Sequence, residues 1–193
     1  MPRLFIATEL SAEALQLATQ IEEALQAALR RRTRVRWTRN EGRHVTLAFL
    51  GQVDDSRVAE LGQLVAAVAA RHQPLAVKVG GMGAFPNTRR ARVLWVGVAD
   101  ASGALERLAA DLQQSLRSVG YELDEREFRG HVTLGRVADR QGVDVNEAHA
   151  EVPAQSVAVQ LDALVLFESQ LSPSGARYRQ LRRATLGAAG HAV

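Results

Sequence analysis

The sequence contains the tetrapeptide HVTL twice, at His44–Leu47 and at His131–Leu134. Polar and apolar residues alternate in both copies, and this period is typical of a β-strand that buries one of its two faces. The valine and leucine would enter a core, while the histidine and threonine would share the opposite face. Two structurally equivalent lobes, each carrying one of these strands, would explain the repeat.

Three helical patterns, each with apolar residues three or four positions apart, separate the strand-like runs. The first follows a possible cap at Ser11, the second follows Asp54 and Asp55, and the third begins near Ser102 and stops at Gly120. Their apolar positions are Leu17, Ile21, Leu25 and Leu29; Val58, Leu61, Val65 and Val68; and Leu105, Leu108, Leu112 and Leu116. Each helix needs a sheet against which this apolar face can pack.

Strand-like runs occur before, between and after these helices. They cover residues 4–9, 34–37, 44–51, 75–81, 93–98 and 131–137. A long alternation from Val157 to Phe167, with Gln160 and Asp162 on the opposite face, predicts one further half-buried strand. The order of helices and strands matches neither a strict parallel alternation nor an all-β pattern, so it favours an α+β fold.

The composition fits a globular protein of the cytoplasm. With 193 residues, of which 47% are hydrophobic, the chain can bury a core. The longest apolar runs, such as Leu64–Ala70, are far shorter than the roughly 20 residues of a membrane helix. The first residues lack the pattern of a signal peptide. The absence of cysteine fits a reducing compartment and excludes disulfides, thiolate nucleophiles and cysteine zinc sites.

Arginine is concentrated in three blocks, Arg30–Arg36, Asn87–Arg92 and Ala176–Arg183. The net charge is only +3, yet the sequence pI is about 10.1. Because the planar guanidinium group suits phosphate, these blocks indicate a polyanionic partner such as RNA. A solvated basic surface without a specific partner is the alternative that the charges alone leave open.

Two imidazoles on one surface would suit displacement at phosphorus. One can take a proton from the attacking oxygen while the other gives a proton to the leaving oxygen. A histidine pKa near 6.5 allows both protonation states around neutral pH. The hydroxyls of Thr46 and Thr133 can bind phosphate oxygens, and Arg136 can stabilise the developing charge. This chemistry requires no metal ion.

A less specific interpretation also fits either motif taken alone. His44 or His131 would then be an ordinary polar residue on a sheet, beside a threonine chosen for its β-propensity. A zinc site is weaker still, because neither copy offers a second ligand at helix spacing. The other histidines look incidental: His72 at a helix end, His149 in a polar segment and His191 in the tail.

The two His-x-Thr pairs resemble those of the two-histidine (2H) phosphoesterase superfamily. The closer similarity is to its bacterial and archaeal RNA 2′,3′-cyclic phosphodiesterases, also described as 2′-5′ RNA ligases. The similar segments are Arg3–Leu10, Arg43–Gly51, Phe85–Val98, Phe128–Val137 and Leu166–Leu181. They cover nearly the whole chain in order.

The resemblance implies an α+β fold with two pseudo-symmetric lobes, each an antiparallel sheet with helices on its outer face, around a central cleft. Residues 1–193 would form a single bilobal domain with one motif per lobe. His44 corresponds to the proton donor and His131 to the proton acceptor of the family. Thr46 and Thr133 correspond to phosphate-binding residues. Arg136 matches the arginine that closes the second motif strand, and Phe49 falls where an aromatic ring can stack on a base.

Two departures from the family pattern lie at the entrances of the motif strands. Gly130 stands where proline is common, and the lead-in TRNEGRH, residues 38–44, lacks the usual proline and leucine. Glycine gives the strand entrance more conformational freedom. The catalytic letters are intact, so these differences bear on the loops and on substrate preference.

The resemblance therefore predicts an enzyme without cofactor or metal that opens a terminal 2′,3′-cyclic phosphate on RNA and leaves a 2′-phosphomonoester. We expect a monomer whose partner is RNA with such an end, for example a tRNA fragment, or a small cyclic nucleotide. One alternative is the joining of a cyclic phosphate to a 5′-hydroxyl as a 2′-5′ bond. Another is a non-catalytic protein that binds RNA or nucleotides.

Overall fold

The computed structural model describes residues 1–152, 154–172 and 175–188, which form a nine-stranded sheet with helices on its outer face. The strands are β1 (Arg3–Thr8), β2 (Val35–Trp37), β3 (Val45–Gln52), β4 (Leu75–Phe85), β5 (Val93–Ala99), β6 (His131–Val137), β7 (Ser156–Leu161), β8 (Ala163–Ser172) and β9 (Gly175–Thr185). The helices are α1 (Ala12–Leu29), α2 (Val58–Ala70), α3 (Ala104–Ser118) and α4 (Asn146–Glu151), with short 3₁₀ turns η1 (Asn40–Gly42), η2 (Asp55–Arg57) and η3 (Thr88–Arg90).

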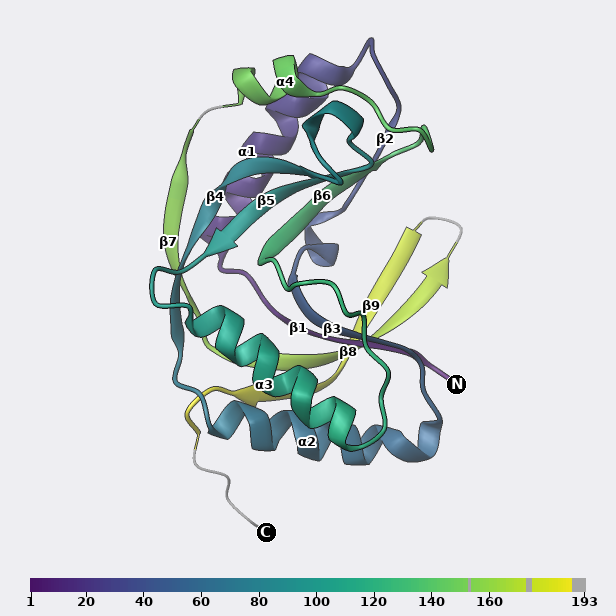
Figure 1. Ribbon diagram of the computed structural model, residues 1–193, viewed down its shortest axis with the longest axis vertical. Helices are drawn as coiled ribbons and strands as arrows, with labels where there is room; N and C mark the ends of the chain where they lie inside the picture. The colour runs from purple at the N-terminus through teal and green to yellow at the C-terminus, as the bar shows by residue number, and fades with distance from the viewer. Residues whose placement is uncertain (153, 173–174, 189–193) are drawn as a thin grey trace.

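The sheet consists of two antiparallel halves that meet at the two motif strands (Figure 1). The strand order is β7-β4-β5-β6-β3-β1-β8-β9, and β2 pairs with the later residues of β6, Gly135–Val137, on the side opposite β5. Between β3 and β6 the described pairing consists of Val45 opposite Val132. One half therefore carries the strand of His131, and the other carries the strand that follows His44. This arrangement confirms the predicted α+β class.

The four helices lie on the outer face of the curled sheet (Figure 1). Helices α1 and α4 lie against the half with β6, and α2 and α3 lie against the half with β3. The Ser11 hydroxyl caps α1 by accepting a hydrogen bond from the Ala14 amide at 3.3 Å. The predicted helical positions lie in the core, except that Val58 is only partly buried. The predicted helices are confirmed by this packing.

A second apolar cluster lies on the concave face. Phe5, Ala7, Val165 and Phe167 form it, and Tyr178 packs against it. Strands β1 and β8 are therefore buried on both faces, because Leu4, Ile6, Leu164 and Leu166 belong to the helix-covered core.

The prediction of one half-buried strand from Val157 to Phe167 was wrong. The chain bends at Asp162 and forms two strands, β7 beside β4 and β8 beside β1. Residues 163–167 are all buried, so alternation on one face cannot describe this segment. The segment from Val157 to Phe167 thus passes from β7, at the edge of the half with β6, to β8 in the half with β3.

Strand β9 and helix α4 were not predicted. The third arginine block forms most of β9, whose polar side chains project from the edge of the sheet. The helix α4 has six residues and buries Ala148, too little for a helical period to be visible in the sequence. In the described part of the chain, no helix combines the length and apolar character needed to cross a membrane.

Gly130 is required by close packing rather than by conformational freedom. A Cβ atom at this position would lie 2.3 Å from the Val98 carbonyl oxygen and 2.9 Å from Leu105 Cδ2. The Gly130 carbonyl also accepts a hydrogen bond from the Val98 amide at 3.0 Å. The entrance to β6 is therefore fixed against β5 and α3 by the absence of a side chain.

The entrance to β3 is fixed by a buried ion pair. Arg43, directly before His44, pairs with Glu22 of α1, and their side chains are 2% and 13% exposed. The Arg43 Nη1 also donates to the Thr19 hydroxyl at 2.8 Å. Since α1 packs on the half that contains β6, this pair links the strand of His44 to the opposite half.

We predict that Arg43→Met lowers the free energy of unfolding by about 3 kcal/mol, because Glu22 is then buried without its partner. The double variant Glu22→Leu/Arg43→Met should recover much of this loss, since no unpaired charge remains. Denaturant unfolding at neutral pH measures both. Equal destabilisation by the single and double variants would show that the ion pair is not the cause.

Candidate active site on the concave face

His44 and His131 lie on the same concave face of the sheet. The strands β3 and β6 run antiparallel about the Val45–Val132 pair, so the two motifs approach each other head to tail. In this register His44 is next to the position of Thr133, and Thr46 is next to that of His131. The positive charge of His131 affects the pKa of His44, which places the two imidazoles within electrostatic reach of each other.

A β-bulge in β6 brings Arg136 to the face of His131. Thr133 is opposite Trp95, Gly135 is opposite Leu94, and Arg136 is opposite Val93, so one extra residue of β6 lies between Thr133 and Gly135. In a regular strand, residues five positions apart point to opposite faces. The bulge reverses this parity, because the extra residue shifts every later side chain.

Strand β3 contains a bulge at the equivalent place. Thr46 is opposite Ala7, and Phe49 is opposite Phe5, although the two pairs are three positions apart on β3 and only two positions apart on β1. Phe49 thereby joins Thr46 on the concave face, five positions after His44. Phe49 is thus the counterpart of Arg136 in the other half of the site.

Both bulges contain a small residue four positions after the histidine. A Cβ atom on Gly135 would lie 2.7 Å from Val35 Cγ1 and 2.9 Å from Trp37 Cε3. The corresponding residue of the first motif, Ala48, is 6% exposed. The fourth position is packed in each half, and this packing fixes the direction of the fifth side chain.

His44 packs against three aromatic side chains, Phe5, Phe167 and Tyr178, called the aromatic floor below. Its ring centroid is 4.7 Å from Phe5 in a stacked arrangement and 5.2 Å from Tyr178 in an edge-on one. Burial, with a smaller contribution from the charge of His131, lowers the pKa of His44 from 6.5 to about 4. In the free protein this imidazole is therefore neutral at neutral pH.

His131 is held by the backbone of its own strand entrance. Its Nδ1 lies 2.7 Å from the Arg129 carbonyl oxygen, and its ring is edge-on to Phe85 at 5.0 Å. A carbonyl oxygen can only accept, so Nδ1 carries a hydrogen and the neutral ring keeps its lone pair on Nε2. Burial lowers the pKa of His131, the Arg129 hydrogen bond opposes this, and the charges of Arg136 and Arg129 lower it further.

The remaining predicted site residues share this surface. Thr46 and Thr133 are half-buried, and neither hydroxyl forms a hydrogen bond to another described residue. Arg136 is exposed and close enough for its charge to act on His131. Phe49 is 58% exposed with its ring 5.6 Å from Phe5. The structure therefore brings together all six residues that the sequence singled out.

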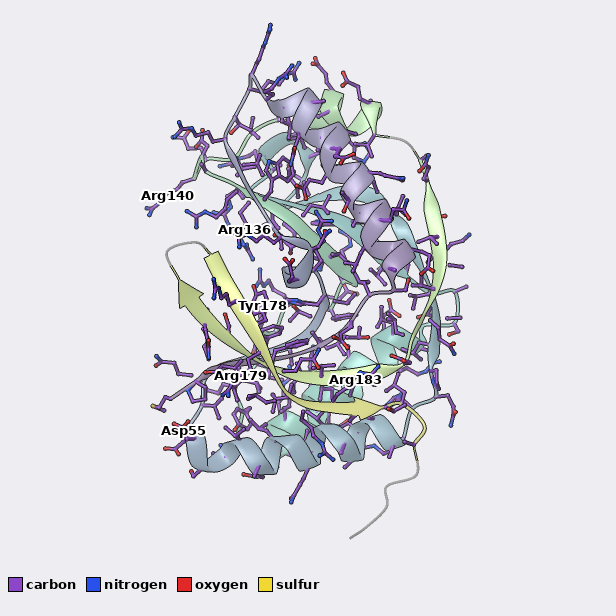
Figure 2. The ribbon with its side chains drawn as sticks, turned by 180° about the vertical axis from the view of Figure 1, so that it is seen from behind. Asp55, Arg136, Arg140, Tyr178, Arg179 and Arg183 are labelled. Carbon is purple, nitrogen blue, oxygen red and sulfur yellow. The ribbon has the colours of Figure 1, made fainter. Side chains whose placement is uncertain are left out.

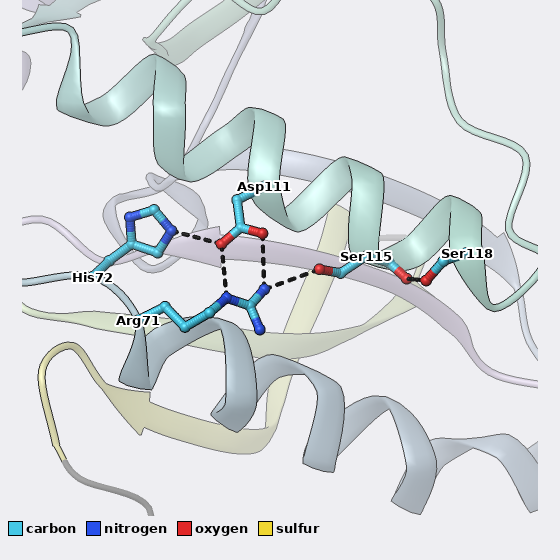
Figure 3. Close-up of polar contacts among 5 residues, drawn as sticks. All are labelled: Arg71, His72, Asp111, Ser115 and Ser118. Carbon is cyan, nitrogen blue, oxygen red and sulfur yellow. Dashed lines mark hydrogen bonds and ion pairs between the residues drawn. The ribbon is translucent and has the colours of Figure 1, made fainter.

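The other described histidines lie outside this group. His72, just after α2, has its Nε2 2.8 Å from Asp111, which also pairs with Arg71 (Figure 3). His149, in α4, has its Nε2 3.0 Å from the Met82 carbonyl. The position of His191 lies outside the described residues. Across residues 1–152, 154–172 and 175–188, no three His, Asp or Glu side chains gather as metal ligands would.

Two surface hollows, of about 400 and 510 Å³, are also present. The smaller lies between α1 and β7, and the larger lies beside Arg71, His72 and Arg107. Neither contains a motif residue, and the polar groups around Arg71 are already bonded to one another. The concave face is the better candidate because it carries both motif histidines, and the hydroxyls of Thr46 and Thr133 form no hydrogen bond to another described residue.

Sequence reasoning missed the aromatic residues around the two histidines. Phe5, Phe167 and Tyr178 surround His44, and Phe85 and Trp95 surround His131. Each lies in a segment that the resemblance covered, yet only the register of β1, β4, β5, β8 and β9 shows which ring faces the site. Their position on strand faces shared with the motifs is the signal that could have identified them.

Residues 16–172 match the 2′-5′ RNA ligase superfamily. An RNA 2′,3′-cyclic phosphodiesterase of Aeropyrum pernix is 32% identical over 155 residues, 78% of this chain and 86% of the relative. One of Archaeoglobus fulgidus is 34% identical over 143 residues, 74% of this chain and 78% of the relative. One of Geobacillus stearothermophilus is 33% identical over 167 residues, 86% of this chain, which spans 52% of that relative's length.

Solved structures show the same fold. A protein of Thermus thermophilus has a TM-score of 0.81 at 22% identity, with 96% of this chain and 98% of that one covered. E. coli LigT in complex with 3′-AMP has a TM-score of 0.72 at 24% identity, with the same coverage of 96% and 98%. With most of its length matched in sequence, the chain belongs to the 2′-5′ RNA ligase superfamily.

Proposed function

We propose that this protein hydrolyses the terminal 2′,3′-cyclic phosphate of RNA to a 2′-phosphomonoester. The observation that carries the proposal is the pair of imidazoles on one concave face, each accompanied by a threonine whose hydroxyl bonds to no other residue that the structure describes. Relatives named RNA 2′,3′-cyclic phosphodiesterase, matched over most of this chain, support the same substrate.

The two histidines would divide the proton transfers between them. Nε2 of His131 takes a proton from water as its oxygen attacks phosphorus, and the bond from phosphorus to the 3′ oxygen breaks. His44 protonates that leaving oxygen, so the product carries a 2′-phosphate and a 3′-hydroxyl. Thr46 and Thr133 donate hydrogen bonds to the non-bridging oxygens, and Arg136 stabilises their increased charge. Phe49 offers an exposed ring for a base.

The low pKa of His44 requires that the substrate assist its protonation. A bound phosphate anion favours the charged form of a nearby imidazole, so its arrival raises the pKa of His44. His131 must instead be neutral in order to accept a proton. Its hydrogen bond to the Arg129 carbonyl already leaves Nε2 free to accept. The different surroundings of the two rings support the assignment of His44 as donor and His131 as acceptor.

Ligation is a second candidate because it uses the same groups. A 5′-hydroxyl would replace water as the nucleophile and form a 2′-5′ bond. The superfamily description favours this possibility, whereas the names of the relatives favour hydrolysis. A protein that only binds RNA is less consistent with two histidines in unequal environments, since phosphate binding alone does not require a donor and an acceptor.

We also propose that the chain acts as one bilobal domain, as a monomer, in the cytoplasm. The continuous sheet through both halves supports one domain. The absence of cysteine fits a reducing compartment. Size-exclusion chromatography with light scattering would measure the oligomeric state.

His44→Ala and His131→Ala should each slow turnover of a cyclic-phosphate oligonucleotide by roughly 10²–10⁴-fold, because each removes one proton transfer. Binding should fall much less, because Arg136 and the threonines remain. Steady-state kinetics, oligonucleotide binding and circular dichroism give the three readouts. Near-wild-type turnover in either variant, with the fold intact, would rule out this mechanism.

The pH optimum of kcat/KM should lie on the acidic side of neutrality. This parameter reports the free protein, in which both histidines have pKa values below 6.5. The profile of kcat should lie at higher pH, because bound phosphate raises both values. Comparing the two profiles tests this, and a kcat/KM maximum above about pH 7 would contradict it.

The residual activities of the variants assign the two limbs of the pH profile. Loss of activity at low pH reports protonation of the base, so His131→Ala should remove the acidic limb. Loss at high pH reports deprotonation of the acid, so His44→Ala should remove the alkaline limb. Each limb of the wild-type profile gives a macroscopic pKa of the pair.

Chelation should leave activity unchanged, because the proposed steps use imidazole, hydroxyl and guanidinium groups only. The measurement is turnover before and after dialysis against EDTA, with zinc or magnesium added back. Loss of turnover that either ion restores would show that the acid-base assignment is incomplete.

A further inference from the structure

The three arginine blocks of the sequence differ in their position in the fold and in their ion pairs. In the block on β9, Arg179 pairs with Glu168 at 2.8 Å, and Arg183 pairs with Asp162 at 3.0 Å. Arg34 and Arg36 of the first block lie on or next to β2, at the end of the His131 half. Figure 2 shows Arg136 and Arg140 in that half and Arg179 and Arg183 with β9 in the other.

Two of the blocks converge on the end of β6. The Ala138 amide donates to the Arg34 carbonyl at 2.9 Å, and the Val137 amide donates to the Arg92 carbonyl at 2.9 Å. The backbones of Arg34 and Arg92 thus flank the same short segment from opposite sides. Residues far apart in the sequence therefore meet just beyond the second motif.

Arg36 and Arg136 are direct cross-strand neighbours on β2 and β6. Directly opposite residues point to the same face, so Arg36 shares the concave face with Arg136, Thr133 and His131. Arg34 lies two positions earlier, directly before β2, and its carbonyl accepts a hydrogen bond from the Ala138 amide, so the extended pairing gives it the same parity. These residues form an arginine strip, defined as Arg34, Arg36 and Arg136, that begins beside the second motif.

The strip lacks protein counterions. In the part of the chain that the structure describes, no carboxylate lies within 4.0 Å of these three guanidinium groups, although seven other arginines have such a partner. Like charges directly opposite each other destabilise an antiparallel pair. This cost is offset when an anion binds between them, and the guanidinium fork suits phosphate oxygens.

We propose that the arginine strip leads outward from Arg136 at the cyclic phosphate, so that Arg34 and Arg36 bind the backbone phosphates of the RNA strand that ends there. A 2′,3′-cyclic phosphate occupies the 3′ end, so all other phosphates of the strand lie on its 5′ side. The strip extends from the site on the His131 side, whereas Arg179 and Arg183 in the other half are paired with carboxylates. The proposal rests on the proposed function and extends it: the preferred substrate is an oligonucleotide rather than a mononucleotide.

The test compares two substrates with the same terminal nucleotide, a nucleoside 2′,3′-cyclic phosphate and a single-stranded octanucleotide that ends in it. For the octanucleotide, Arg36→Gln should raise KM about 10-fold and leave kcat within about twofold. It should not change either constant for the mononucleotide. The slope of log affinity against log salt should fall by about 1. Arg34→Gln should act in the same direction.

Arg117→Gln is the matched control. Arg117 is exposed in the last turn of α3, on the helix-covered side of the other half, and the substitution removes the same charge. It should leave KM for the octanucleotide and the salt slope unchanged. An equal effect of Arg117→Gln and Arg36→Gln would show that only the net charge of the protein matters. That result would overturn the proposal that the strip binds RNA.

Other outcomes separate the strip from the proposed function. If the wild type turns over both substrates with the same KM, or Arg36→Gln affects both alike, the proposal that the strip binds RNA is wrong. The proposed hydrolase activity is then unaffected. If no substrate is turned over, the hydrolase is wrong. Fluorescence anisotropy of a labelled octanucleotide then still tests whether Arg36→Gln weakens binding. Equal competition by polyglutamate would show that the strip binds anions without preference for RNA, which would overturn the proposal.

Discussion

The pairing of Val45 with Val132 is the contact on which the site depends. It joins two antiparallel half-sheets into one curled sheet and sets the register between the two motifs. Because both valines are fully buried, the residues beside them have no freedom to change face. His44 and His131 are therefore brought to the concave surface by the same backbone contact. A slip of one residue in either strand would turn one imidazole into the core.

The bulges extend this arrangement beyond the tetrapeptide. Each half has histidine, threonine, a packed small residue and then a fifth-position side chain returned to the concave face. The backbone device is the same, yet the fifth residue is Phe49 in one half and Arg136 in the other. The halves thus offer an apolar surface on one side and a cation on the other. This difference fits a substrate with a base and a chain of phosphates.

The surroundings of the two histidines differ in the same sense. Aromatic rings and burial keep His44 neutral in the free protein. A backbone carbonyl orients His131, and two arginine charges act on it. Near-identical sequence motifs thereby place their histidines in different surroundings, which suits the opposite proton-transfer roles that we propose. The buried ion pair between Arg43 and Glu22 links the strand of His44 to the half that carries His131.

The sequence by itself determined the α+β class, the three long helices and the two motif strands, because these features repeat with short periods that local pattern identifies. It also singled out the six residues of the candidate site, of which Phe49 was named only through the family resemblance. It did not identify β9, the break at Asp162 or the aromatic floor, because each depends on which distant strand lies alongside. The position of Arg136 shows the limit most clearly: regular alternation would turn it away from His131, and the bulge against Trp95 and Leu94 brings it back. Only the tertiary structure decided this, because a bulge is a mismatch between two strands and exists only once both are paired.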